Sequence, residues 1–368
     1  MTEKFSLKDA LFNPQKIKYL ADLVDDVYVE FDKNSFVRDI VVELPSVELK
    51  QRTACICANL QKYLPADFIK SVQIILKSLP KELDINKTDA DFGDFIFAPF
   101  GEFVAKNGLQ KGKLKISFNA LAEITKRFSV EFAMRDFINK YPLESFEFLC
   151  EMAISRNYHQ RRLASECLRP KLPWATGIDF DYKKPLEILD KLYFDNTRFV
   201  VRSVANHLND IAKIDAYLVV KTLQKWQQEN KQNGQEFEFL SKHALRTLLK
   251  KGDKNALNFL GFCDNPQIEI TLFKIKNSTI VLGDYLEFEF NIFCKKAQKL
   301  MIDYIVYYPN STQKVFKIKQ VFLENSLKIN KKHLFRQMTT KKLYAGKYKI
   351  ALQINGNILT KNSFSLSF

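Results

Sequence analysis

The sequence predicts a mainly α protein in which a stack of helices is followed by a small all-β domain. Apolar residues recur every three to four positions up to about residue 266, which is the spacing of amphipathic helices. Beyond that point they alternate with polar residues, which is the spacing of strands. The chain has 368 residues, enough for two or three domains. We therefore expect one domain in residues 1–266 and a second in residues 267–368.

The helical part begins with a clear amphipathic pattern. One face carries Ile17, Leu20, Ala21 and Val24. Later segments of 12–18 residues repeat this spacing, and short polar or proline-bearing breaks separate them at Leu64-Pro65, Leu79-Pro80, Tyr141-Pro142 and Asp253-Lys254. Many short helices with short connections are typical of a solenoid of antiparallel helix pairs of the HEAT-like kind. No strict repeat period is visible, so this prediction depends on helix number and loop length.

The second part has the pattern of strands. Apolar side chains alternate with glutamates in residues 285–290, and a similar alternation fills residues 348–354. Asn355-Gly356 is a strong signal for a two-residue hairpin turn. Six to eight short strands in about 100 residues favour an immunoglobulin-like sandwich. The sequence has no Cys-Trp-Cys pattern, which excludes an antibody-type domain.

The charge is concentrated in the predicted sandwich. The whole chain has a net charge of +15. Residues 267–368 contain 16 lysines and one arginine against six acids, a balance of +11, and residues 1–266 carry the remaining +4. A basic balance of this size favours nucleic acid or an anionic surface as partner. The alternative is a lysine-rich solvated surface.

The composition excludes other classes of protein. Apolar residues make up 46% and charged residues 27%, as in a globular chain. No apolar run approaches the roughly 20 residues of a membrane-spanning helix, and the N-terminal residues lack the pattern of a secretory signal. The six scattered cysteines and four histidines offer no zinc spacing, so we expect no metal and no cofactor. A reduced protein of the bacterial cytosol fits best.

Polar stripes lie opposite the apolar faces of three predicted helices, in residues 159–169, 199–213 and 237–251. They consist of Arg162, Glu166 and Arg169; of Arg202, Asn206 and Asp210; and of Lys242, Arg246 and Lys250. Upstream, Glu131 and Arg135 have i, i+4 spacing. Each stripe alone is compatible with a solvated face held by helix ion pairs. Together they favour a cationic track for DNA with isolated carboxylates that act on a cationic group.

Trp174 is the most conspicuous aromatic residue. It ends the run Arg169-Pro170-Lys171-Leu172-Pro173-Trp174, in which the prolines stop a helix and stiffen a loop. Such a residue either covers a helix end or offers a stacking surface to a sugar or base. The other tryptophan, Trp226, lies within a predicted helix and is interpreted as packing.

These motifs together resemble those of the AlkC-type alkylpurine DNA glycosylases. One of them is Ser165-Glu166-Cys167-Leu168-Arg169-Pro170-Lys171-Leu172-Pro173-Trp174-Ala175, which is similar to the S-E-G-x-R-P-x-L-P-W-A run of that family. Further similar runs are RSVANHLNDIAK in residues 202–213, HALRTLLKKG in 243–252, ITKRF with EFA in 124–133, FNP in 12–14 and ELKQR in 48–52. The resemblance covers roughly residues 5–265.

The resemblance implies a HEAT-like repeat DNA glycosylase of base excision repair. Such an enzyme acts as a monomer on double-stranded DNA containing N3-alkylated bases, 3-methyladenine and 3-methylcytosine, without flipping the base into a pocket. Some members of the branch carry a C-terminal immunoglobulin-like domain that helps to hold the DNA, and the basic sandwich predicted above matches that role; no membrane is involved. By resemblance the catalytic residues are Glu166, Asp210, Trp174 and Glu131. The DNA-binding residues are Arg162, Arg169, Arg202, Asn206, Lys242, His243 and Arg246, with Asn206 near the lesion.

The residue types suit this chemistry. An N3-alkylated purine is cationic and already a good leaving group, so the barrier is the positive charge that develops on the sugar. A carboxylate stabilises that charge and orients water, and an aromatic face favours the same cation. Which carboxylate acts as the base stays open at this point.

Two departures from the family pattern leave alternatives open. Cys167 stands where the family usually has a small residue such as glycine, and Ile214-Asp215-Ala216 replaces the usual Asp-His-Pro. One alternative is a non-catalytic HEAT-repeat protein that binds distorted or branched DNA, although it would not need Glu166, Asp210 and Trp174 together. The other is a protein–protein scaffold, which the concentrated positive charge disfavours.

Overall fold

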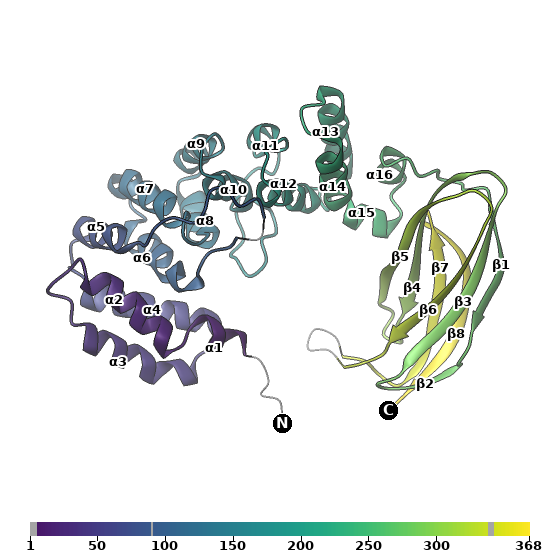
Figure 1. The fold of residues 1–368 in the computed structure, drawn as a ribbon, viewed down its shortest axis with the longest axis horizontal. Coiled ribbons are helices and arrows are strands. Elements are labelled where there is room, and N and C mark those ends of the chain that lie inside the picture. The colour runs from purple at the N-terminus through teal and green to yellow at the C-terminus, as the bar shows by residue number, and fades with distance from the viewer. Residues whose placement is uncertain (1–5, 90, 338–341) are drawn as a thin grey trace. The chain divides into compact units, whose positions relative to one another are not determined.

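A computed structural model describes residues 6–89, 91–337 and 342–368 (Figure 1). The helices are α1 (Leu7–Leu11), α2 (Pro14–Asp25), α3 (Lys33–Glu43), α4 (Leu49–Tyr63), α5 (Phe68–Ser78), α6 (Ala98–Gly108), α7 (Leu114–Ile124), α8 (Glu131–Lys140), α9 (Pro142–Met152), α10 (Tyr158–Glu166), α11 (Leu186–Leu192), α12 (Arg198–Ile211), α13 (Ala216–Glu229), α14 (Gly234–Ala244), α15 (Arg246–Lys251) and α16 (Lys254–Phe259). The strands are β1 (Ile268–Ile275), β2 (Thr279–Val281), β3 (Tyr285–Cys294), β4 (Gln298–Tyr307), β5 (Gln313–Leu323), β6 (Ser326–Leu334), β7 (Gly346–Ile354) and β8 (Asn357–Ser367). The predicted order, helices first and strands second, is confirmed.

The chain divides into two compact units. The first consists of Met1–Ile214 and Trp226–Ala244, and the second of Asp215–Lys225 and Leu245–Phe368. Helices α15 and α16 thus belong to the same unit as the strands. The domain limit predicted after residue 266 lies in the connection between α16 and β1 and stays a prediction. In the described residues no helix is long and apolar enough to cross a membrane.

The first unit is built from helices that pack on their neighbours. In one row α4 contacts α6 and α6 contacts α8, and further along α10 contacts α12 and α12 contacts α14 (Figure 1). Helices α7 and α9 pack against the members of this row that precede them, α6 and α8. A row of alternate helices with the intervening helices behind it is the arrangement expected of stacked helix pairs.

Local sequence signals explain where these helices begin. In α2 the side chain of Asn13 accepts a hydrogen bond from the amide of Lys16, and Pro14 occupies the first turn, where its missing N–H costs nothing. The predicted apolar face of this helix, Ile17, Leu20, Ala21 and Val24, is fully buried. Asp32 and Asp67 cap α3 and α5 in the same way.

Two predicted helices differ from the structure. The helix expected over residues 159–169 is α10, which ends at Glu166. The chain then turns because Pro170 has no amide to continue the helix, and the carbonyls of Cys167 and Arg169 accept hydrogen bonds from Arg135 instead. The helix expected over residues 237–251 is two helices, α14 and α15, separated at Leu245, which has a φ of −87° and a ψ of 0°.

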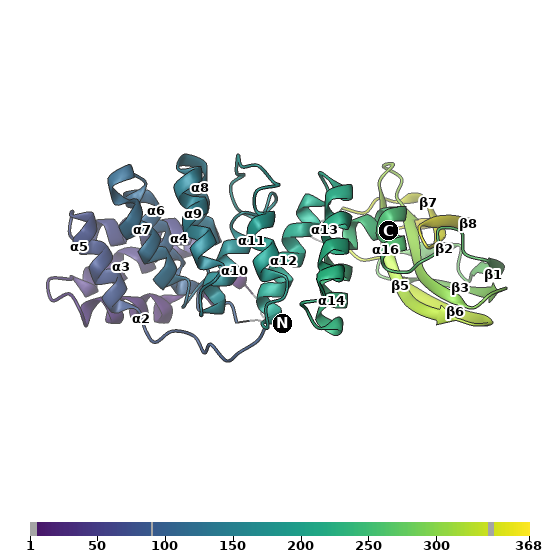
Figure 2. The same cartoon turned by 90° about the horizontal axis from the view of Figure 1, so that it is seen from above.

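A long segment without helix or strand joins α5 to α6. Figure 2 shows residues 79–89 running from α5 toward the beginning of α12. At the far end the carbonyl of Thr88 accepts a hydrogen bond of 3.0 Å from the amide of Phe199, and Asp89 forms an ion pair with Arg202. The segment therefore brings one acidic residue, Asp89, onto the first turns of α12.

In the second unit the strands form two sheets packed face to face. One has the order β1-β3-β6 and the other β2-β8-β7-β4-β5. Side chains from both sheets fill the space between them, with aromatic contacts such as Phe288 against Tyr304 at 5.2 Å and Tyr348 against Phe364 at 5.5 Å. The prediction of six to eight short strands in a two-sheet sandwich is confirmed for the described residues.

The predicted hairpin turn joins β7 to β8. Asn355 and Gly356 both have positive φ angles, 47° and 80°, as a two-residue type I′ turn requires. The turn touches the end of α15, where Gly252 also has a positive φ of 73°. A Cβ on Gly252 would lie 2.8 Å from the Cα of Gly356, so the two backbones meet at a distance that only glycine allows.

Candidate nucleic-acid site

The predicted carboxylates lie where α10 ends beside α12. Glu166 is the last residue of α10, and Asp210 lies in the last turn of α12. Both are almost fully buried, with exposed fractions of 5% and 1%. Ser203 of α12 donates a hydrogen bond of 2.6 Å to Oε2 of Glu166, which fixes that carboxylate against the neighbouring helix.

Arg169 joins the two carboxylates. Its Nη1 donates to Oε1 of Glu166 at 2.6 Å, and its Nε donates to Oδ2 of Asp210 at 2.9 Å. The other oxygen of Asp210 accepts a hydrogen bond of 2.7 Å from Lys213. Arg169 has an exposed fraction of only 6%, so a single buried guanidinium holds both acids in place.

The charges around Glu166 keep it ionised. Burial by itself would raise the pKa of Glu166, but Arg162, Arg169 and the hydrogen bond from Ser203 outweigh burial, so the pKa lies below its usual value. The Nη2 of Arg162 lies 3.8 Å from Oε1 of Glu166. The carboxylate is therefore available as a fixed negative charge near neutral pH.

Arg162 connects Glu166 to the third predicted carboxylate, Glu131. Its Nη2 lies 3.7 Å from Oε1 of Glu131, which stands in the first turn of α8. Its Nη1 donates a hydrogen bond of 2.6 Å to Ser129, and its guanidinium lies over the ring of Phe199 at 4.5 Å. The second oxygen of Glu131 is buried and accepts no hydrogen bond from the described residues.

Trp174 lies on the loop that follows this turn. The loop is fastened by Arg135 of α8, whose Nη1 donates to the carbonyls of Cys167 and Arg169 and whose Nε donates to the carbonyl of Thr176 at 2.6 Å. Lys50 donates to the carbonyl of Trp174 itself. One buried arginine thus positions both the turn after Glu166 and the loop that carries the indole.

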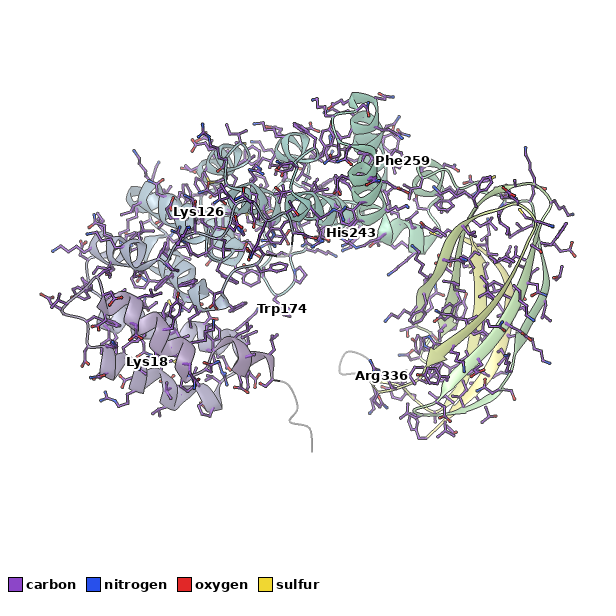
Figure 3. The ribbon with its side chains drawn as sticks, viewed as in Figure 1. Lys18, Lys126, Trp174, His243, Phe259 and Arg336 are labelled. Carbon is purple, nitrogen blue, oxygen red and sulfur yellow. The ribbon has the colours of Figure 1, made fainter. Side chains whose placement is uncertain are left out.

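The indole of Trp174 is exposed. Its exposed fraction is 66%, and Figure 3 shows it on the loop, projecting away from the helices of its unit. Its φ angle of 66° is in the left-handed region, which is unfavourable for a bulky residue. A strained backbone that presents an exposed aromatic ring is typical of a contact surface for a ligand.

The remaining predicted residues lie nearer the surface. Arg202 forms an ion pair with Asp89 at 2.5 Å, and Oδ1 of Asn206, on the same helix, accepts a hydrogen bond of 2.9 Å from Nε2 of His243 of α14. Lys242 forms an ion pair with Glu238, one turn earlier. Arg246 begins α15 and belongs to the second unit.

The structure corrects three interpretations of the polar stripes. Arg162, Glu166 and Arg169 are buried and do not form a solvated face. Arg169 lies beyond the helix, and its guanidinium is occupied by two carboxylates, which does not fit a phosphate contact. Arg135 does not pair with Glu131, four residues earlier, because it binds three backbone carbonyls.

Sequence reasoning missed the supporting residues Ser203 and Ser129, and it gave Arg135 the wrong partner. Ser203 and Ser129 carry no signal of their own, since serine occurs at many buried and exposed positions. Arg135 has an exposed fraction of 1%, and its place on the apolar side of α8, between Met134 and Ile138, was the available signal. A charged side chain at such a position has to find internal partners.

The two departures from the family pattern have structural explanations. Cys167 is fully buried, and burial raises the pKa of its thiol, so it acts as a packing residue. Asp215 accepts a hydrogen bond of 2.9 Å from the amide of Leu218 and so caps α13. In the described part of the chain no three His, Cys, Asp or Glu side chains gather in a group that could hold a metal ion.

Comparisons with known proteins agree with this architecture. Residues 269–368 match the family model described as "Uncharacterised protein YhaZ, C-terminal Ig-like domain". The chain is 31% identical to YhaZ of Bacillus subtilis (strain 168) over 366 residues, which covers 97% of this chain and 98% of that protein. It is also similar to the structure of the Pseudomonas fluorescens alkylpurine DNA glycosylase AlkC bound to DNA containing an abasic site analog. That similarity has a TM-score of 0.88 at 28% identity and covers 99% of this chain and 100% of the other.

Proposed function

The chain belongs to the family of YhaZ and the AlkC-type alkylpurine DNA glycosylases, and we propose that it is itself a DNA glycosylase of base excision repair. Its substrate would be duplex DNA containing N3-alkylated bases such as 3-methyladenine and 3-methylcytosine. The observation that carries the proposal is the pair of buried carboxylates, Glu166 and Asp210, fixed by Arg169 behind a loop that presents Trp174. The similarity to a glycosylase bound to DNA with an abasic site analog supports the same conclusion.

We further propose that the helices of the first unit form a HEAT-like solenoid that grips the duplex. The row that includes α10, α12 and α14 supplies Arg202, Asn206, Lys242 and His243, all of which are at least partly exposed. These cations and amides suit phosphate oxygens at the DNA backbone. The site residues stand on helices and on one fastened loop, which favours a fixed surface that meets the lesion within the duplex without flipping the base.

The chemistry follows from the charges. Loss of a cationic base leaves positive charge on the deoxyribose, and a fixed carboxylate stabilises that charge as it develops. Glu166 and Asp210 are held as anions by Arg169, so they need no reorganisation during the reaction. The face of Trp174 offers a second favourable surface to a cationic sugar.

Glu131 is the carboxylate that we assign to the water. Both oxygens of Glu166 and both oxygens of Asp210 accept hydrogen bonds within the protein. Glu131 keeps one oxygen, Oε2, without a donor among the described residues. A carboxylate oxygen of this kind can accept a hydrogen bond from water and, later, its proton.

The sandwich would act as a second DNA-binding element. Its 17 basic and six acidic residues give it most of the excess positive charge of the chain. On the edge strand β5, Lys317 and Lys319 are exposed, as phosphate contacts require. This proposal rests on charge and on the family model that matches the sandwich.

The test is release of free 3-methyladenine from methylated duplex DNA. We expect release by the wild-type protein and a loss on the order of 100-fold in Glu166→Gln and Asp210→Asn, because each removes a preorganised charge. Glu151→Gln, at the exposed end of α9, is the matched control and should retain activity.

The structure also offers one argument for a non-catalytic DNA-binding protein. Glu166 and Asp210 both form ion pairs with Arg169, and such ion pairs also occur in networks that only stabilise a fold. Absence of base release, together with tight binding of distorted DNA that weakens steeply with salt, would establish that function instead.

A further inference from the structure

A cavity of about 340 Å³ opens between the first turns of α4, the middle of α6, the beginning of α8 and the loop of Trp174. Its walls include the small residues Gly101, Ala105 and Ala133, which leave room where the helices would otherwise be filled by side chains. Small-molecule sites in proteins typically measure about 300–1,000 Å³. The volume is therefore suitable for a ligand of one or two rings.

Aromatic rings form much of the remaining wall. They belong to Phe95, Phe128, Phe132 and Trp174. The side chains of Phe132 and Trp174 are 41% and 66% exposed, although residues of this kind are usually buried. Aromatic surfaces of this kind stack on planar heterocycles and tolerate many of them.

The polar groups of the cavity leave one acceptor unused. Lys106 and Glu102 form an ion pair at 2.7 Å. Asp136 lines the same cavity, is exposed to solvent, and forms no side-chain hydrogen bond or ion pair with the described residues. Partial burial, and then the negative charge of Glu102, raises the pKa of Asp136. An N–H donor on a ligand could replace water at this carboxylate.

The cavity adjoins the proposed catalytic cluster. Ser129 lines it and accepts the hydrogen bond from Arg162, the residue that lies between Glu131 and Glu166. Trp174 belongs to both, since its loop closes one side of the cavity. A base freed from the sugar at the cluster would meet this opening next.

We propose that the cavity is a product site that binds the excised alkylated base, stacked against Phe132 and Trp174 with its exocyclic amine directed to Asp136. This inference rests on the proposed glycosylase function. It adds a binding site for the excised base, and this site is used only after the glycosidic bond has broken. A duplex-bound base would not have to enter the cavity before cleavage.

The experiment measures binding of free 3-methyladenine to the DNA-free protein by calorimetry and by tryptophan fluorescence. Trp174 is exposed and Trp226 is 1% exposed, so a fluorescence change on binding reports the Trp174 side. We expect saturable binding that weakens at least about tenfold in Phe132→Ala and in Asp136→Asn. Phe194→Ala is the matched control, because Phe194 is 40% exposed and does not line the cavity.

A second arm adds free 3-methyladenine to the base-release assay. It should slow turnover of the wild-type protein and of Phe194→Ala, and it should slow Phe132→Ala much less. Base release without binding of the free base, or equal binding by all folded variants, would overturn the product site and leave the glycosylase intact. Saturable binding that needs Phe132, with no release from methylated DNA, would refute the glycosylase and keep the cavity as a binding site for heteroaromatic bases.

Discussion

Substitution of Arg169 by methionine tests whether this residue forms a buried ion pair, as in the structure, or contacts a DNA phosphate, as the sequence suggested. The side chains of Arg169, Glu166 and Asp210 have exposed fractions of 8%, 6% and 2%. Removal of the cation leaves two buried carboxylates with weaker compensation, from Arg162 at 3.8 Å and from Lys213. Breaking a buried pair in this way costs about 3–5 kcal/mol. We expect Arg169→Met to lower the free energy of unfolding by that amount at pH 7.

The pH dependence of this loss follows from the sign of the pKa shift. In the wild-type protein the pKa of Glu166 is lowered, so its contribution to stability is present above the usual carboxylate pKa and disappears as the pH falls. Without Arg169, less positive charge opposes the effect of burial, so the pKa of Glu166 rises. The difference between wild type and variant should therefore be largest at neutral pH and shrink as the pH approaches about 4.

Urea denaturation followed by circular dichroism measures both effects, and Lys213→Met is the control. Lys213 contacts the same Asp210 but is 32% exposed, so its removal should cost no more than about 1 kcal/mol. DNA affinity measured against salt gives an independent readout. A buried Arg169 leaves the salt dependence unchanged, whereas loss of a phosphate contact reduces the slope by about one. A stability loss under about 1 kcal/mol together with a reduced slope would refute our interpretation.

Three further predictions concern backbone strain, DNA binding and acid sensitivity. Trp174→Gly should abolish base release while the free energy of unfolding stays equal or rises by up to about 1 kcal/mol in urea titrations, because glycine relieves the positive φ; a clear destabilisation would mean that the indole packs. Asp89→Asn should tighten duplex binding by up to about fivefold in fluorescence anisotropy, because it frees Arg202; unchanged or weaker binding would remove Arg202 from the phosphate contacts. Burial lowers the pKa of His159 and of His207 to about 4, so the unfolded chain binds more protons between about pH 4 and 6.5. As the pH falls through this range, the free energy of unfolding should decrease by about 1 kcal/mol per pH unit for each histidine. Equal stability at pH 7 and pH 5 would contradict this prediction.

The fold was predictable because its two parts have different hydrophobic periods. The change of period near residue 266 anticipates the last helix at Phe259 and the first strand at Ile268. The turn at Asn355-Gly356 was predicted correctly because few residues other than asparagine and glycine adopt two successive positive φ angles. The break at Leu245 was not predictable, since no proline, glycine or polar cluster marks it.

The site was only partly predictable, for a different reason. Spacing tells which residues share a helix face, but it does not tell what covers that face. The polar stripe of α10 meets the polar stripe of α12, and Arg169 lies between the acids of both. Each stripe examined alone has the pattern of a solvated surface. Their mutual burial depends on tertiary packing, which makes the ion pairs visible only in the structure.

The close contact of Gly252 and Gly356 determines where an expressed fragment of the second unit can begin. The connection from α16 to β1 is bonded to the sandwich, with Asn355 donating to the carbonyl of Cys263 and Lys299 to that of Leu260. A fragment that starts at residue 267 would lose both acceptors and uncover the hairpin at Gly356. An expression fragment intended to keep the sandwich intact should therefore start upstream of α15, so that it contains α15, α16 and their connection to the strands.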